Sequence, residues 1–128
     1  MRTTRLKLLT QQILENASSP VSVPDILEAL RVLKITANKT TIYRELESLM
    51  YQGLITELDF GEGKKRYEIR DDHHHHLICT QCSSVEHIEL DELEGLLTTT
   101  QAKIAKQMDF KVIEHKLELF GMCKGCQA

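Results

Sequence analysis

Two cysteine pairs limit the folds open to this chain. Cys79-Thr-Gln-Cys82 and Cys123-Lys-Gly-Cys126 are CxxC motifs with forty residues between them. Each motif presents two thiolates at one tight turn, and two such turns brought together complete a tetrahedral four-cysteine zinc site. The alternatives are two disulfides, which a reducing cytoplasm disfavours, and a redox-active CxxC, which needs only one pair. We therefore expect a structural zinc ion (Zn2+) that ties the end of the chain to its middle.

Four consecutive histidines precede the first cysteine pair. In an extended backbone His73 and His75 face one way while His74 and His76 face the other, so one short segment can serve two metal sites. Loose metal binding by an exposed histidine run is the alternative. We expect His87 to pack or to face solvent rather than to bind metal. The remaining ligands must come from distant parts of the chain, and the candidates are Glu68, Glu94 and His115.

The charge of the chain differs between its two halves. The whole chain of 128 residues carries a net charge of −3, which opposes binding to nucleic acid. Residues 1–70 hold 11 Lys and Arg against 9 Asp and Glu, while residues 71–128 hold 5 against 10. All six histidines and all four cysteines lie beyond residue 72. The sequence thus predicts a mildly basic half and an acidic, ligand-rich half, each too small to bury a large core.

Neither half carries a membrane signal. No apolar run approaches the roughly 18 to 20 residues that span a bilayer, and the first residues lead into no signal-peptide core. We therefore expect a cytoplasmic protein without membrane contact.

The first half has the pattern of three short helices followed by a hairpin. This order is typical of a winged helix-turn-helix, in which the third helix enters the major groove and the hairpin lies along a phosphate backbone. An ordinary solvated surface is the alternative. The expected helices cover residues 4–15, 22–33 and 39–52, and the strands cover residues 54–60 and 64–69. The expected DNA contacts are Arg5 on the first helix, Lys39, Thr40, Tyr43 and Arg44 on the third, and Lys64, Lys65 and Arg66 at the hairpin.

The second half predicts a small sheet with one helix. Residues 90–108 have helical periodicity and residues 111–120 alternate as a strand, with further strands at 77–79 and 84–90, where His87 falls on the middle strand. The fold class expected for the chain is therefore α+β. An edge strand of so small a sheet has unpaired backbone N–H and C=O groups. We therefore expect the sheet to pair with a second copy of the chain.

The order of these parts resembles the ferric uptake regulator (Fur) family of bacterial metal-sensing repressors. The matching segments cover nearly the whole chain. They are Thr4-Arg-Leu-Lys-Leu-Leu9, Thr40-Thr-Ile-Tyr-Arg-Glu-Leu46, His73-His-His-His-Leu-Ile-Cys-Thr-Gln-Cys82 and His115-Lys-Leu-Glu-Leu-Phe-Gly-Met-Cys-Lys-Gly-Cys126. The resemblance implies a winged-helix DNA-binding domain at residues 1–70, a hinge with metal ligands at 71–76, and a dimerisation and metal-binding domain at 77–128. It also implies a homodimer on an inverted-repeat DNA operator.

The resemblance assigns the candidate ligands to three sites. Cys79, Cys82, Cys123 and Cys126 match the structural zinc site. His73, His75, Glu94 and His115 match a site in the dimerisation domain, and Glu68, His74 and His76 match the regulatory site at the hinge. Pro20 replaces a histidine that iron-responsive members usually have, and no cysteine stands just before the histidine run. The fourth regulatory ligand is therefore open, with Glu57, Asp59, Asp71 or water as candidates.

The function implied is metal-dependent repression of genes for metal uptake or homeostasis. A site of imidazoles and carboxylates without a thiolate suits Fe2+, Mn2+ or Zn2+. We expect no enzymatic activity, because no nucleophile or general base stands beside the histidine run. The alternatives are a peroxide- or redox-sensing regulator of the same family and, less favoured, a zinc-dependent enzyme.

Overall fold

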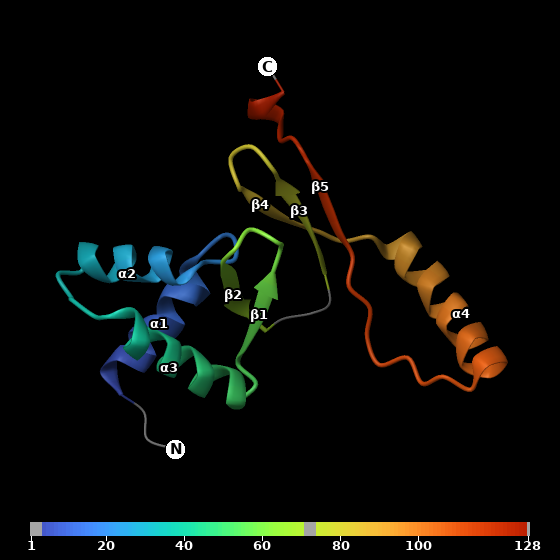
Figure 1. The fold of residues 1–128 in the computed structure, drawn as a ribbon, viewed down its shortest axis with the longest axis horizontal. Coiled ribbons are helices and arrows are strands. Elements are labelled where there is room, and N and C mark those ends of the chain that lie inside the picture. The colour runs from blue at the N-terminus through green and yellow to red at the C-terminus, as the bar shows by residue number, and fades with distance from the viewer. Residues whose placement is uncertain (1–3, 71–73, 128) are drawn as a thin grey trace. The chain divides into compact units, whose positions relative to one another are not determined.

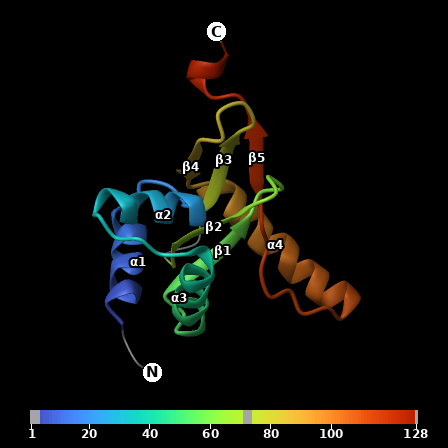
Figure 2. The same cartoon turned by 60° about the vertical axis from the view of Figure 1, so that its left-hand side comes forward.

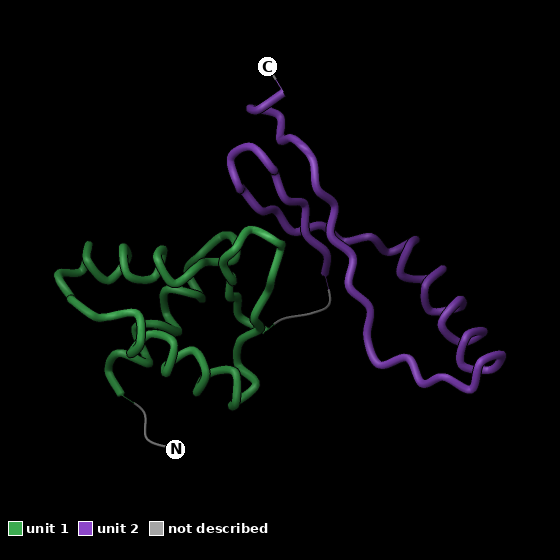
Figure 3. The backbone as a smooth tube through the Cα atoms, viewed as in Figure 1, with its two compact units in different colours: residues 1–72 green, residues 73–128 purple. Residues whose placement is uncertain are grey.

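The computed structural model describes residues 4–70 and 74–127, and the chain divides into two compact units, residues 1–72 and 73–128 (Figure 3). Helices and strands both contribute, as the α+β prediction requires (Figure 1). His73 and Asp71, two predicted ligand positions, lie outside the described residues.

The first unit begins with three helices whose starts are fixed by their capping side chains. They are α1 (Arg5–Asn16), α2 (Val23–Val32) and α3 (Lys39–Tyr51). Thr4 caps α1, Ser22 and Asp25 form a reciprocal capping box on α2, and Asn38 caps α3. Gly53 follows α3 with φ +75°, and its N–H donates to the Met50 carbonyl at 2.9 Å. A glycine is suited to this left-handed position, so α3 ends where the sequence predicts.

A hairpin follows the helices. Strands β1 (Ile55–Asp59) and β2 (Lys65–Ile69) pair antiparallel, with Glu57 opposite Tyr67 and Thr56 opposite Glu68. Val21, in the connection between α1 and α2, exchanges two backbone hydrogen bonds with Tyr67 at 2.7 and 2.9 Å. The hairpin is therefore fastened to the helices by backbone as well as by side chains. The result is the winged helix-turn-helix arrangement that the sequence predicts.

One apolar core holds the first unit together. Its buried members come from all three helices and both strands, and each helix contributes the stripe that its 3.6-residue period places on one face. Burial of this kind contributes roughly 1.5–3 kcal/mol for each large aliphatic side chain. The core consists of Leu14, Val23, Ile26, Leu30, Ile42, Leu46, Leu49, Ile55 and Tyr67.

The second unit contains a three-stranded sheet and one long helix. Its elements are β3 (His75–Cys79), β4 (Val85–Ile88), α4 (Asp91–Met108), β5 (Glu118–Gly121) and a short 3-10 turn, η1 (Lys124–Cys126). The sheet order is β4-β3-β5, with β4 antiparallel and β5 parallel to β3. The prediction that His87 lies on the middle strand is wrong, since β4 is at an edge and β3 occupies the centre.

The last strand is shorter than predicted. Residues 111–117 alternate in sequence but form no strand, and of the strand predicted at 111–120 only residues 118–120 pair with β3. The ladder begins with His76 opposite Glu118, and β3 itself begins at His75, so the residues before Glu118 find no strand opposite them within the described chain. Alternation alone does not make a strand, because a ladder partner must also be present.

The helix α4 leaves much apolar surface uncovered. Figures 1 and 2 show α4 standing away from the three-stranded sheet, and none of its residues, all of which are described, is buried. Within the described part of this unit the buried apolar residues are only Ile78, Cys79 and Val85. A core of three residues is too small to stabilise a unit of this size by itself. The unit therefore needs other stabilising contacts.

None of the described helices is both long enough and apolar enough to cross a membrane.

Candidate metal centres and nucleic-acid interface

The four cysteines converge at one end of the three-stranded sheet. Parallel pairing of β3 with β5 places Cys79 opposite Gly121, so both CxxC turns lie at the same end of the sheet, where these two strands finish. All four thiols are free, and their sulfur atoms lie within 4.8 Å of one another. The sulfurs of Cys82 and Cys123 are 3.7 Å apart. Four thiolates around zinc in a tetrahedron stand roughly 3.8 Å apart, so this arrangement fits zinc and not a disulfide.

The pKa values of the thiols also favour a cation at the centre of the four-cysteine group. Backbone N–H groups of Cys123 and Cys82 point at the Cys79 sulfur and lower the pKa of that thiol to about 6. The three neighbouring sulfurs raise the pKa of Cys126 to about 12. Four thiolates therefore do not coexist on their own, and a divalent cation at their centre removes that conflict by favouring the deprotonated form of each.

A second group joins β3, α4 and the segment before β5. His75, Glu94 and His115 place their ligand atoms within 4.8 Å of one another. Nε2 of His75 and Nε2 of His115 both contact the same carboxylate oxygen of Glu94, the second at 3.1 Å. Glu94 lies in the first turn of α4, where the helix dipole stabilises its negative charge.

Hydrogen bonds on the far side of each ring orient this group. Nδ1 of His75 lies 3.0 Å from the Leu117 carbonyl, which only accepts, so Nδ1 carries a proton, and in the neutral ring Nε2 then directs its lone pair toward Glu94. Nδ1 of His115 contacts the Gln101 side chain at 2.9 Å. A lone pair facing a carboxylate requires a proton or a cation between them. Two nitrogens and one oxygen suit Zn2+, Fe2+ or Mn2+.

A third group consists of three imidazoles, those of His74 just before β3, His76 on β3 and His87 on β4. His74 and His76 project from the same side of the chain, and their Nε2 atoms are 3.2 Å apart. His87 lies opposite His76 in the ladder, and its ring is 4.2 Å from that of His74 and 5.2 Å from that of His76. Two imidazole nitrogens bound to one metal at about 2.1 Å stand roughly 3.0–3.4 Å apart. The three rings therefore form a candidate metal group within the second unit.

The structure places His87 among the candidate ligands, contrary to our expectation that it only packs or faces solvent. Its side chain is exposed, yet it joins the other two rings through the antiparallel register of β3 and β4. The sequence contained a signal for this pairing. If the Cys79–Cys82 turn joins two antiparallel strands, His76, three residues before Cys79, lies opposite His87, five residues after Cys82.

The two wing residues that we considered as a fourth hinge ligand are engaged elsewhere. Glu57 bonds to Lys65 and Tyr67, and Asp59 accepts from the Gly61 N–H at 2.9 Å. Successive side chains of a strand alternate, and Thr56 is the partner of Glu68, so Glu57 and Asp59 project from the opposite face of the hairpin. We therefore withdraw both as ligands beside Glu68.

The candidate DNA contacts on α3 lie on one exposed face. Lys39, Thr40, Tyr43 and Arg44 are exposed, while Ile42, Leu46 and Leu49 of the same helix are buried. Arg5 of α1 is also exposed. Tyr43 is 46% exposed although its ring is large and partly apolar. The start of α3 thus offers cationic, hydroxyl and aromatic groups together with a helix N-terminus, all of which suit a phosphate or a base edge.

The hairpin offers fewer cations than its sequence suggests. Lys64 is exposed, and Lys65 is exposed but pairs with Glu57 at 2.9 Å. Arg66 is buried, donates two hydrogen bonds to Glu62 at 2.8 and 2.9 Å, and a third to the Pro20 carbonyl at 3.3 Å. The expectation that Arg66 lies along a phosphate backbone is therefore wrong. Its guanidinium fastens the hairpin to the connection before α2.

Comparison with known proteins agrees with this combination of a winged-helix unit and three ligand groups. The model of the ferric uptake regulator family matches residues 1–120. The chain belongs to the ferric uptake regulator family. The ferric uptake regulation protein of Neisseria gonorrhoeae is 32% identical over 125 residues, which cover 97% of this chain and 83% of that protein.

Solved structures of Fur-family proteins share the fold over nearly the whole chain. The Helicobacter pylori ferric uptake regulator, described as having three functional metal binding sites, matches with TM-score 0.83 and 25% identity over 100% of this chain and 83% of its own. A zinc-bound manganese uptake regulator matches with TM-score 0.73 and 31% identity, covering 96% of this chain and 91% of its own. The Fur resemblance seen in the sequence is thus confirmed, while the metals named for these relatives differ.

Proposed function

We propose that this chain is a metal-dependent DNA-binding repressor of genes for metal uptake or homeostasis, acting as a homodimer. The observation that carries the proposal is the group of His74, His76 and His87, two members of which begin the second unit in the sequence. A ligand group that starts so few residues after the wing can connect metal binding with DNA binding. The other two groups support it, since four thiols fit structural zinc.

The regulatory step that we propose is a shift between conformations. Glu68 is on β2, six residues before His74, and an extended chain of six residues spans at most about 20 Å. The chain connection is therefore short enough to let the Glu68 carboxylate approach the three imidazoles. In the metal-bound state Glu68 joins them, and the angle between wing and second unit becomes fixed. In the metal-free state Glu68 is released, and the two DNA-binding units of the dimer no longer keep one spacing.

The donor set leaves three candidate regulatory metals. Three imidazoles and one carboxylate suit Fe2+, Zn2+ or Mn2+, and the absence of a thiolate in this set removes the soft donor that would favour zinc. His75, Glu94 and His115 form the further metal site of the second unit, with His73 as a proposed ligand.

A second copy of the chain is the partner that the second unit needs. Much of its apolar surface is exposed, including Ile113 at 87%, and β5 has one open edge in the sheet. Pairing through this surface buries apolar groups and satisfies the edge strand. The large apolar side chains exposed in the described part of this unit are Leu96, Met108, Phe110, Ile113, Leu119, Phe120 and Met122. As a regulator of DNA the dimer acts in the cytoplasm.

The dimer predicts the symmetry of the operator. Selection from random-sequence duplexes by the metal-loaded protein should recover an inverted repeat, whose half-sites lie one helical turn, about 34 Å, or a multiple apart. Sequencing the selected pool checks this. Recovery of single, asymmetric sites, or of no sequence preference, would contradict the proposed dimeric repressor.

The helix and the hairpin should contribute differently to DNA binding. We expect Tyr43→Ala to weaken operator binding while leaving non-specific binding nearly unchanged, because the exposed ring on α3 reads bases. Lys64→Ala should weaken both by a similar factor, because it contacts only phosphate. Titrations of both variants on operator and random duplex measure the two factors. Equal loss on both duplexes for Tyr43→Ala would exclude a base-reading role for that residue.

A further inference from the structure

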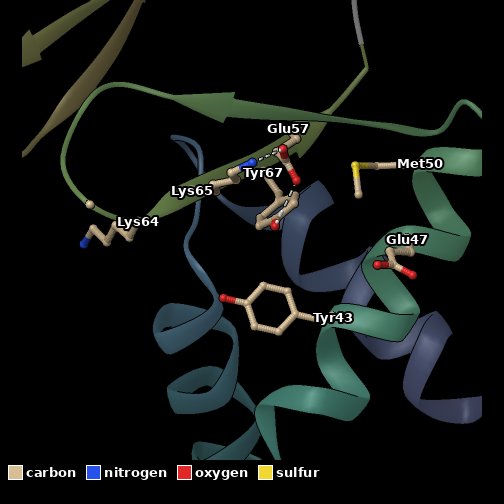
Figure 4. A pocket seen from close by; sticks show the side chains of 8 residues that line it. Tyr43, Glu47, Met50, Glu57, Lys64, Lys65 and Tyr67 are labelled. Atoms are coloured by element: carbon tan, nitrogen blue, oxygen red, sulfur yellow. Dashed lines mark hydrogen bonds and ion pairs between the residues drawn. The ribbon is translucent and has the colours of Figure 1, made fainter.

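A pocket of about 330 Å³ lies between α3 and the hairpin of the first unit. In Figure 4 Tyr43 and Glu47 enter from α3, while Glu57, Lys65 and Tyr67 belong to the hairpin. The walls of the pocket are α3 and the hairpin, the two elements that contact DNA in the proposed function. Two carboxylates on such a surface are unexpected, since DNA presents phosphates there.

Glu57 is the best-held group of this pocket. One carboxylate oxygen accepts from Lys65 Nζ at 2.9 Å and the other from the Tyr67 hydroxyl at 3.3 Å. Glu57 and Tyr67 are directly opposite in the β1–β2 register, and Lys65 lies two residues from Tyr67 on the same face. Tyr67 is 2% exposed and belongs to the core, so it anchors the carboxylate.

The position of Lys65 follows from this anchor. Its side chain is 53% exposed and that of Glu57 is 33% exposed, so solvent and ligands reach both. The hydrogen bond from Lys65 to Glu57, together with the charge of that carboxylate, raises the pKa of Lys65. The ammonium group therefore keeps its charge but already has an anionic partner. A phosphate that recruits Lys65 must displace a carboxylate that is fixed in place and repels the phosphate.

We propose that Glu57 limits the affinity of this protein for DNA by withholding Lys65 from the phosphate backbone. The proposal rests on the proposed DNA-binding function and adds a residue that opposes it. Binding that depends on phosphate contacts alone is thereby kept weak, and stable binding requires the base contacts of α3. A built-in repulsive element of this kind is a known route to specificity.

The salt dependence of non-specific binding tests this directly. Each additional phosphate contact steepens the dependence of log K on log salt by about 0.9. The metal-loaded full-length Glu57→Gln variant should therefore lose about three- to fourfold more affinity than the wild type between 50 and 200 mM salt on a random-sequence duplex. The introduced amide keeps an acceptor for the buried Tyr67 hydroxyl, so the fold should be retained, which a thermal melt checks.

Two further variants separate the causes. Glu28→Gln makes the same charge change in the exposed Glu28–Arg31 pair of α2, which joins at 2.6 Å, and should leave the salt slope at the wild-type value. Adding Lys65→Ala to Glu57→Gln should return the slope to the wild-type value, whereas Lys65→Ala alone should change it little.

The results that overturn the inference are distinct. A wild-type slope in Glu57→Gln, an equal steepening in Glu28→Gln, or weaker binding by Glu57→Gln each contradicts it while leaving the DNA-binding proposal standing. Failure of the metal-loaded wild type to bind any duplex at 50 mM salt overturns the proposed function and this inference together.

Discussion

Replacing Cys123 with serine is expected to unfold the second unit while leaving the first unit folded. The substitution removes one of four thiolates whose sulfurs lie within 4.8 Å of one another. Structural zinc contributes about 10–16 kcal/mol of apparent binding free energy in small domains, which exceeds the typical stability of a small unit. Within its described residues the second unit buries only Ile78, Cys79 and Val85 as apolar groups, so little else holds it.

Zinc analysis after dialysis, combined with amide NMR spectra, measures this outcome. Signals from residues 74–127 should collapse to the narrow dispersion of an unfolded chain, whereas signals from residues 4–70 should persist, because that unit has its own core. Thr80→Ala is the matched control, since Thr80 lies in the other CxxC turn of the same four-cysteine group, and its side chain offers no ligand and only a 3.3 Å hydrogen bond to Gly121. Full zinc retention and unchanged spectra in Cys123→Ser would contradict a structural role for the four cysteines.

Removal of the paired hinge imidazoles should abolish the response to metal. We expect metal to strengthen operator binding by roughly 5- to 150-fold in the wild type, the usual range of a coupling free energy of 1–3 kcal/mol. In His74→Ala combined with His76→Ala this ratio should fall to about one, because His87 and Glu68 alone cannot hold the ion. Fluorescence anisotropy on a selected operator duplex, with buffered metal, measures the ratio.

Two single variants make this result specific to the hinge group. His87→Ala removes one of the three proposed imidazole ligands and should raise the metal concentration needed for half-maximal DNA binding by about 10-fold or more, since even residues that only support a metal ligand contribute roughly 10- to 100-fold to affinity. His115→Ala disturbs the separate group around Glu94 and should keep most of the metal response. An unchanged ratio in the double variant, or an equal loss in His115→Ala, would place the switch outside His74, His76 and His87.

Local signals in the sequence predicted most of the first unit. Thr4, Ser22 and Asn38 each offer a side-chain oxygen to the first turn that follows, and such caps act within three residues. The alternation of the histidine run was equally local, and it separated His75 from His74 and His76. Spacing within each CxxC motif likewise predicted four thiols at one place, which the structure shows.

Features that depend on a partner far along the chain were harder to predict. Residues 111–117 alternate like a strand, but the described chain offers them no strand to pair with. Arg66 reads as a surface cation beside Lys64 and Lys65, yet Glu62 and the Pro20 carbonyl hold it buried. The role of His87 depends on the register between β3 and β4, which no single residue specifies. Register and ion pairing are tertiary properties, and periodicity carries little information about them.

The affinity of the wild-type dimer for its selected operator, with and without divalent metal, tests the central claim most directly. The titration is performed under anaerobic conditions against buffered Fe2+, Mn2+ and Zn2+ in turn, with zinc retained in the four-cysteine site throughout. The metal-regulated repressor proposed here predicts that at least one of these ions strengthens operator binding by about fivefold or more, at a concentration that leaves non-specific binding unchanged. Equal operator affinity in the presence and absence of all three ions would contradict it.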